Sequence, residues 1–201
     1  MHDASPPAAF VYRWMAGLFL APPDADALAD YRGPEGQSLL DRLAADPALS
    51  LPANDLRALT SPGSDLAAAA DRLATAHAGA FLVGGRRSAP PYASVWLSPR
   101  GLLYQEPARE MTRLLAAAGL SLPDDVPEPP DHIGFQLNLL ADLDERERAG
   151  TPLPIAPEQF ISSHLMPWLP QFATACAALR EPFFYAGLAA ALNSYLSDKV
   201  R

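Results

Sequence analysis

The sequence predicts an all-α protein, a single helical bundle domain over residues 1–201 with long proline-rich connections. Apolar residues recur at steps of three to four in several segments, which is the period of one face of an amphipathic helix. No alternating strand pattern of useful length and no internal repeat accompanies them. Because 49% of the 201 residues are hydrophobic, the chain can bury a sizeable core.

Three helices are predicted in the first part of the chain. Apolar side chains recur every four residues over 10–21, and the proline pair at 22–23 ends this helix. A short helix carries the leucines of 39–43. A long alanine-rich helix covers 65–82, and the two glycines at 84–85 close it.

The middle of the chain mixes extended segments with one helix. The prolines hold 86–91 extended, and a surface loop follows. Glu106 and Pro107 open a helix that ends at Gly119, with proline suited to the first turn. The acidic, proline-rich connection 123–130 is stiff and is predicted as a possible hinge.

Three further helices are predicted in the last part. One covers 130–150, a second carries an apolar stripe over 161–172, and the final one covers 183–196. Pro167 and Pro170 are expected to kink or break the second of these, because proline removes a backbone hydrogen bond and crowds the preceding turn.

The charge composition excludes some partners and favours others. With 15 basic and 23 acidic residues the formal charge is −8, which repels nucleic acid and anionic lipid and favours a cationic partner. No run approaches the roughly 18 apolar residues of a membrane span, so no stable membrane insertion is expected. The stretch 10–21 predicts an amphipathic helix rather than a signal peptide, because Arg13 interrupts it.

The single cysteine gives an expectation about the compartment. Cys176 lies among alanines in a predicted helix, so we expect a small buried apolar group without a disulfide partner. A reducing cytoplasm is the expected location.

Two motifs in sequence order carry a family resemblance. Segment 90–97 reads Pro-Pro-Tyr-Ala-Ser-Val-Trp-Leu, and segment 128–132 reads Glu-Pro-Pro-Asp-His. Further matching segments lie at 73–84, 160–172 and 184–188. Over residues 66–196 the chain resembles the TorD/DmsD/NarJ family of redox-enzyme maturation chaperones, with Tyr92 where many relatives place tryptophan.

The resemblance implies a cytoplasmic chaperone rather than an enzyme, with no cofactor and no metal. Its partners would be the twin-arginine signal peptide and the folded body of a client oxidoreductase, commonly a molybdopterin enzyme, held until cofactor insertion is complete before export. Carboxylates would pair with the arginines, and the aromatic loop would line an apolar groove. The signal-peptide-binding residues predicted in this way are Tyr92, Ser94, Trp96, Glu128, Pro130, Asp131 and His132. A monomer or a domain-swapped dimer is expected.

Several alternatives stay open on sequence alone. A NarJ-like assembly factor for a molybdoenzyme subunit that is not exported is the alternative within the family. One alternative is that Asp131 has a purely structural role, as a carboxylate in the first turn of a helix. Another is that the aromatic loop simply packs onto the bundle. A small helical hydrolase using Asp131 and His132 lacks a Gly-X-Ser-X-Gly elbow, and a metal site from His77, His132 and His164 lacks a recognisable ligand spacing.

Overall fold

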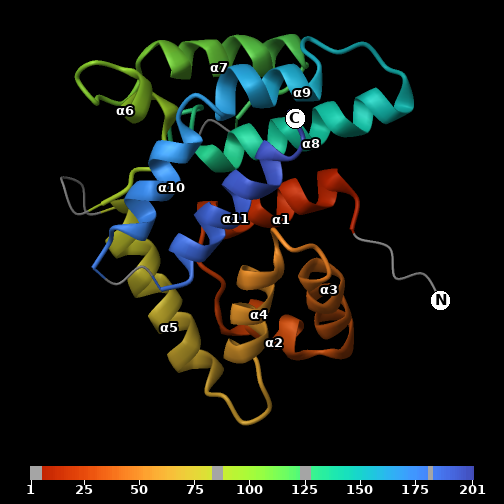
Figure 1. Ribbon diagram of the computed structural model, residues 1–201, viewed down its shortest axis with the longest axis vertical. Coiled ribbons are helices and arrows are strands. Elements are labelled where there is room, and N and C mark those ends of the chain that lie inside the picture. Colours follow the sequence, from red (N-terminus) through yellow and green to blue (C-terminus); the bar gives the residue numbers. More distant parts are fainter. Residues whose placement is uncertain (1–5, 83–87, 123–127, 181–182) are drawn as a thin grey trace.

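The computed structural model describes residues 6–82, 88–122, 128–180 and 183–201 (Figure 1). Within these ranges the regular structure is helical, apart from one isolated antiparallel bridge between Tyr92 and His132. The elements in chain order are α1 (Ala8–Leu20), α2 (Ala25–Arg32), α3 (Pro34–Ala44), α4 (Ser50–Leu59), α5 (Leu66–His77), η1 (Ala78–Leu82), α6 (Ala93–Leu97), α7 (Glu106–Ala117), α8 (Ile133–Ala149), α9 (Pro157–Phe160), η2 (Ile161–Leu165), α10 (Leu169–Ala177) and α11 (Tyr185–Ser197). The predicted all-α fold class is confirmed.

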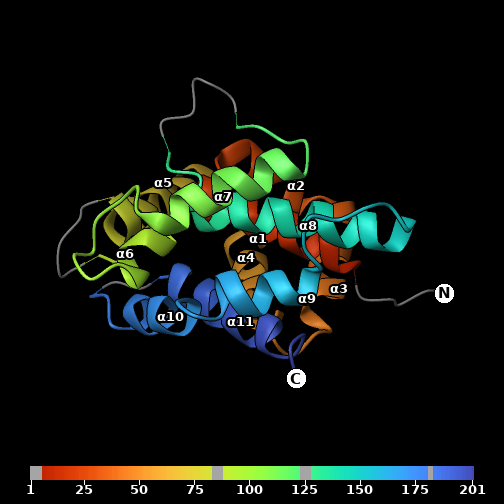
Figure 2. The same ribbon diagram turned by 90° about the horizontal axis from the view of Figure 1, so that it is seen from above.

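Helices α1 and α8 pack antiparallel through the middle of the bundle (Figures 1 and 2). Arg13 on α1 makes two hydrogen bonds, of 2.6 and 2.8 Å, to the carboxylate of Glu145 near the end of α8. At the other end, a Cβ on Gly134 would lie 2.4 Å from Cγ of Leu20, so only glycine allows this close approach. The contact fixes the start of α8, and with it the 128–132 motif, against the end of α1.

The other helices surround this pair. Figure 1 shows α2 to α5 in the lower half, α6, α7 and α9 in the upper half, and α10 with α11 between them. Aromatic rings from separate helices meet in the core: Phe19 lies 5.9 Å from Phe172 and 6.0 Å from Phe81, whose ring is 5.2 Å from Tyr185. These ring contacts join α1, near the start of the chain, to η1, α10 and α11.

Most predicted helices are confirmed, with small shifts at their ends. The helix predicted over 65–82 is α5 followed by the π-helical turn η1, and the carboxylate of Asp65 accepts from the backbone of Ala68 at 3.1 Å. The break expected at the prolines of 161–172 is present, because η2 ends at Leu165 and α10 begins at Leu169. Trp168 and Cys176 are fully buried, as their positions in the sequence predicted.

Four short helices were missed, namely α2, α4, α6 and α9. Helix α2 is capped by Asp24, whose side chain accepts from the backbone of Ala27 at 2.8 Å, a signal that the sequence did contain. Helix α4 follows without a side-chain cap. Helix α6 lies in the segment predicted as a surface loop, and five residues are too few to show a helical period.

Some expectations fall on residues that the structure does not describe. These include the closing glycines 84–85 and most of the proposed hinge, since residues 123–127 lie outside the described ranges. The single-domain assignment and the hinge therefore stay predictions. Among the described helices, none has both the length and the apolar character to cross a bilayer.

Candidate functional site

The two sequence motifs meet at a junction between α6 and α8. The backbone of Ile133 donates to the carbonyl of Pro91 at 2.8 Å, and the backbone of Ala93 donates to the carbonyl of Asp131 at 3.2 Å. These two bonds form the isolated bridge between Tyr92 and His132. All seven predicted site residues lie in the two segments that this junction brings together.

Asp131 lies at the centre of the junction and has no exposed surface. Its Oδ2 accepts a 2.6 Å hydrogen bond from the backbone N–H of Ser94, in the first turn of α6. Its backbone carbonyl also accepts from Nε2 of Gln136 at 2.7 Å. The second carboxylate oxygen, Oδ1, has no hydrogen-bond partner among the described residues. Asp131 therefore joins the loop before α8 to the start of α6.

The cap of α8 is His132 rather than Asp131. Its Nδ1 accepts from the backbone N–H of Gly134 at 3.0 Å, which requires this nitrogen to be unprotonated. Burial, with a smaller contribution from His77, lowers the pKa of His132 to about 3, so the ring is neutral near pH 7. Asp131 thus caps α6, whereas the sequence indicated that it would lie at the start of α8.

The same hydrogen bonds separate Asp131 from His132 chemically. The carboxylate is directed to Ser94 and the imidazole to Gly134, so the two side chains do not form the dyad on which the hydrolase alternative depends. The described structure also does not bring together the three histidines considered as metal ligands. Nε2 of His77 lies 3.0 Å from the carbonyl of Phe19, and the described residues contain no cluster of three or more metal-ligating side chains.

Tyr92 and Glu128 form the second polar contact of the junction. The buried phenol of Tyr92 donates to Oε2 of Glu128, and its ring meets the ring of His132 edge-on at 5.1 Å. Burial raises the pKa of Tyr92, and the hydrogen bond to Glu128 raises it further, so the phenol stays protonated. Glu128 itself is half-buried, and its carboxylate is the acidic group of the motif nearest to solvent.

Trp96, Ser94 and Pro130 complete the set. Nε1 of Trp96 donates to the carbonyl of Pro90 at 2.8 Å, while its half-buried ring meets Phe172 at 6.2 Å. Oγ of the buried Ser94 accepts from the backbone of Gln105 at 3.1 Å and ties α6 to the start of α7. Pro130 is half-buried. The loop alternative is thus partly correct, because the aromatic side chains do pack onto the bundle.

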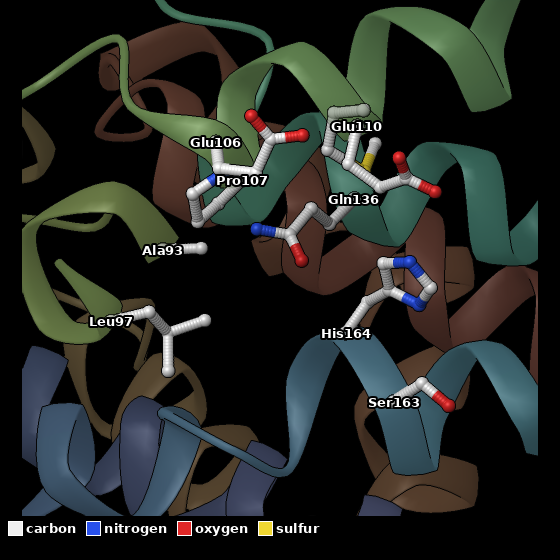
Figure 3. A pocket seen from close by; sticks show the side chains of 9 residues that line it. Ala93, Leu97, Glu106, Pro107, Glu110, Gln136, Ser163 and His164 are labelled. Atoms are coloured by element: carbon white, nitrogen blue, oxygen red, sulfur yellow. The ribbon is translucent and has the colours of Figure 1, made fainter.

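A cavity of about 460 Å³ opens beside the junction, between α6, α7, α8 and η2 (Figure 3). Its lining residues include both acidic and apolar side chains, namely Ala93, Leu97, Glu106, Pro107, Glu110, Met111, Gln136, Ser163 and His164. The cavity is connected to the junction by Ala93, which follows Tyr92, and by Gln136, which donates to Asp131.

None of the site residues predicted from the sequence lines this cavity. Glu106 and Glu110 are four residues apart and share one face of α7, which was a usable signal. Ser163 and His164 lie on η2, a π-helical turn that periodicity does not predict and that is found often at functional sites. Glu110 and His164 both line the cavity, from α7 and η2 (Figure 3). Burial lowers the pKa of His164, and the charge of Glu110 partly opposes this shift.

Comparison with known proteins gives consistent results. The family model for the nitrate reductase delta subunit matches residues 43–174. A chaperone protein TorD from Ferrimonas balearica is 32% identical over 94% of this chain and 86% of its own length. A chaperone protein TorD from Vibrio cholerae is 35% identical over 83% of this chain and 78% of its own length.

A solved structure supports the same fold. The crystal structure of a protein described as a redox enzyme maturation protein, from Archaeoglobus fulgidus, superposes with a TM-score of 0.62. It covers 98% of each chain at 19% sequence identity, which is a similarity of fold.

Proposed function

The chain belongs to the nitrate reductase delta subunit family, and on this basis we propose that it is a chaperone for the maturation of a redox enzyme. It binds the twin-arginine signal peptide of a partner oxidoreductase, a molybdopterin enzyme, and holds it in the cytoplasm until the cofactor is inserted. The observation that carries the proposal is the junction of α6 and α8, where two motifs far apart in the sequence form one polar and aromatic site.

The chemistry of such a peptide fits the surface around the junction. Two arginines need carboxylates, and Glu128, Glu106 and Glu110 all keep some exposure at or beside the site. The apolar run after the arginines needs a groove, and Trp96 and Leu97 present partly exposed apolar surface on α6. The net charge of −8 adds a long-range attraction for a cationic segment.

The seven residues divide into two groups by exposure. We propose that Trp96, Glu128 and Pro130, which keep accessible surface, contact the peptide. The four buried residues act by holding α6 and its neighbouring loop in position, namely Tyr92, Ser94, Asp131 and His132. A direct contact between an arginine and the free Oδ1 of Asp131 would first require the buried carboxylate to become accessible.

Micromolar affinity is a reasonable expectation. It corresponds to about −8 kcal/mol, which one or two arginine pairs and a few buried aliphatic side chains can supply after ordering costs. Nothing in this binding requires covalent chemistry or a cofactor. The protein would act as a monomer or as a domain-swapped dimer.

The alternative within the family is a NarJ-like factor for a molybdoenzyme subunit that is not exported. The match to the nitrate reductase delta subunit model favours keeping this alternative. An oxidoreductase gene beside this one, with or without an arginine pair near the start of its product, separates the two roles.

Calorimetry with synthetic peptides tests the proposal. The chain should bind a peptide with an arginine pair and an apolar run, and replacing both arginines by alanine should weaken binding at least tenfold. Trp96→Ala should weaken the apolar part of the contact and leave the salt dependence that the arginines contribute nearly unchanged. If no peptide of this class binds while the purified chain hydrolyses model esters, the chaperone function is wrong.

A further inference from the structure

The cavity between α6, α7, α8 and η2 combines carboxylates with apolar side chains in its lining. Resting on the proposed function above, we propose that it is the subsite for one arginine of the client peptide, with the neighbouring aliphatic residue of the peptide covering Leu97. The proposal assigns a role to side chains outside both sequence motifs. It also defines where, relative to the junction, the peptide lies.

The acidic edge of the cavity is the first argument. Glu106 and Glu110 both line it, and their side chains are 64% and 39% exposed. Arg113 pairs with both of them, at 2.6 and 2.5 Å, and Arg109 pairs with Glu106 at 2.9 Å, but neither arginine lines the cavity. Figure 3 shows both carboxylates along the α7 edge of the cavity. A cationic guest would therefore meet the carboxylates before it meets the arginines.

The inner end of the cavity supplies a hydrogen-bond acceptor. Gln136 is only 1% exposed, and its Nε2 is committed to the backbone carbonyl of Asp131 at 2.7 Å. This bond fixes the orientation of the amide, so its oxygen points into the cavity (Figure 3). Nδ1 of His164, a second lining residue, is buried and has no hydrogen-bond partner among the described residues. A buried acceptor without a donor favours a guest that carries N–H groups, and a guanidinium has five.

The remaining wall is apolar. Leu97, Pro107 and Met111 line the cavity, and the aliphatic stem of an arginine can lie along such a surface while its charged end reaches the polar groups. The volume of about 460 Å³ is within the usual range of about 300 to 1,000 Å³ for ligand sites.

Exposed apolar surface continues from the cavity into the next loop. Leu97 is 42% exposed, and Leu102 and Leu103 are 46% and 41% exposed. Exposed leucines that lie close together in one segment favour an interaction surface over scattered exposure. An arginine in the cavity would place the aliphatic residues beside it over this segment. A peptide that joins basic and aliphatic residues is thus the occupant that matches both parts.

Two substitutions on α7 with opposite expected signs test the subsite. Glu110→Gln removes a carboxylate from the cavity and should weaken a twin-arginine peptide roughly 3- to 10-fold in calorimetry at low salt. Arg113→Gln removes the competing partner of Glu110 and leaves Glu106 paired with Arg109 alone, so it should tighten the same peptide roughly 2- to 5-fold. Both effects should shrink at high salt, because the groups are partly exposed.

A matched control variant and a double-mutant cycle between Glu110 and the peptide arginine complete the experiment. Glu147→Gln removes an exposed carboxylate elsewhere, on α8, and should change affinity less than either variant. With the relevant peptide arginine replaced by glutamine, Glu110→Gln should have no further effect. If the wild-type chain binds the peptide but both α7 variants behave like Glu147→Gln, the subsite is wrong and the proposed function stands. If no twin-arginine peptide binds the wild-type chain, both are wrong.

Discussion

Asp131→Ala should destabilise the folded chain, because Asp131 caps α6 from another part of the sequence. The substitution leaves the buried N–H of Ser94 without its 2.6 Å acceptor, a cost of about 1 to 3 kcal/mol, and it also leaves a small void. A total of about 3 kcal/mol corresponds to roughly 6 to 12 °C in Tm for a chain of this length. Asp131→Asn should cost less, about 1 kcal/mol, because the amide oxygen can still accept from Ser94.

Thermal and urea unfolding of the variants checks this estimate. Asp71→Ala is the matched control, since Asp71 is exposed on α5. Free energies of unfolding that agree within about 0.5 kcal/mol for Asp131→Ala and Asp71→Ala would show that Asp131 does not stabilise the fold through Ser94. Peptide affinity should be measured well below the melting range of each variant. A loss of about 1 to 3 kcal/mol for Asp131→Asn under those conditions would indicate that the carboxylate also reaches the ligand.

Three further predictions concern pH, packing and reactivity. The pKa of His132 is lowered to about 3 in the fold, below the ordinary value near 6.5, so the unfolded chain binds more protons between these pH values and stability is lost as the pH falls below about 6.5. In urea unfolding, the wild type should lose up to about 1.4 kcal/mol more per pH unit between pH 6 and 4 than His132→Asn, which keeps an N-cap acceptor; parallel curves would contradict this. Gly134→Ala should lower the free energy of unfolding by about 1 to 3 kcal/mol, because the added carbon clashes with Leu20. Gly17→Ala should raise the free energy of unfolding by about 0.5 to 1 kcal/mol, because nothing lies within 4 Å of the added carbon. Equal melting temperatures of the two variants would contradict this difference in packing. Burial raises the pKa of Cys176 to about 12, so a thiol reagent should modify it only at the rate of unfolding, and rapid labelling of the folded chain at pH 8 would show that the thiol is accessible.

The helical architecture was accessible from the sequence because its signals are local. The four-residue period of α1 and the prolines that separate η2 from α10 act within a few residues of the structures that they specify. The convergence of segments 90–97 and 128–132 was accessible only through the resemblance to a family. No period or spacing brings two segments this far apart into contact.

The details of the site depend on tertiary contacts that a sequence pattern does not contain. Helix α6 has five residues and is held by a carboxylate 37 positions away, so neither its existence nor the partner of Asp131 could be predicted locally. The sequence indicated Asp131 as the cap of α8, but the side chain of Asp131 bonds to Ser94, and His132 caps α8 instead. Glu110 and His164 line the same cavity only because the fold brings η2 and α7, which are far apart in the sequence, to its two sides.

The central claim is that this chain recognises the signal peptide of a client oxidoreductase. The direct test mixes the purified chain with the precursor of the oxidoreductase encoded beside it, and in parallel with the same enzyme lacking the leader, and measures complex formation by calorimetry and size-exclusion chromatography. We expect a complex of micromolar affinity with the precursor and a loss of at least tenfold in affinity when the two leader arginines are replaced by alanine. Equal binding of the precursor, the leaderless enzyme and the arginine-free variant would contradict it.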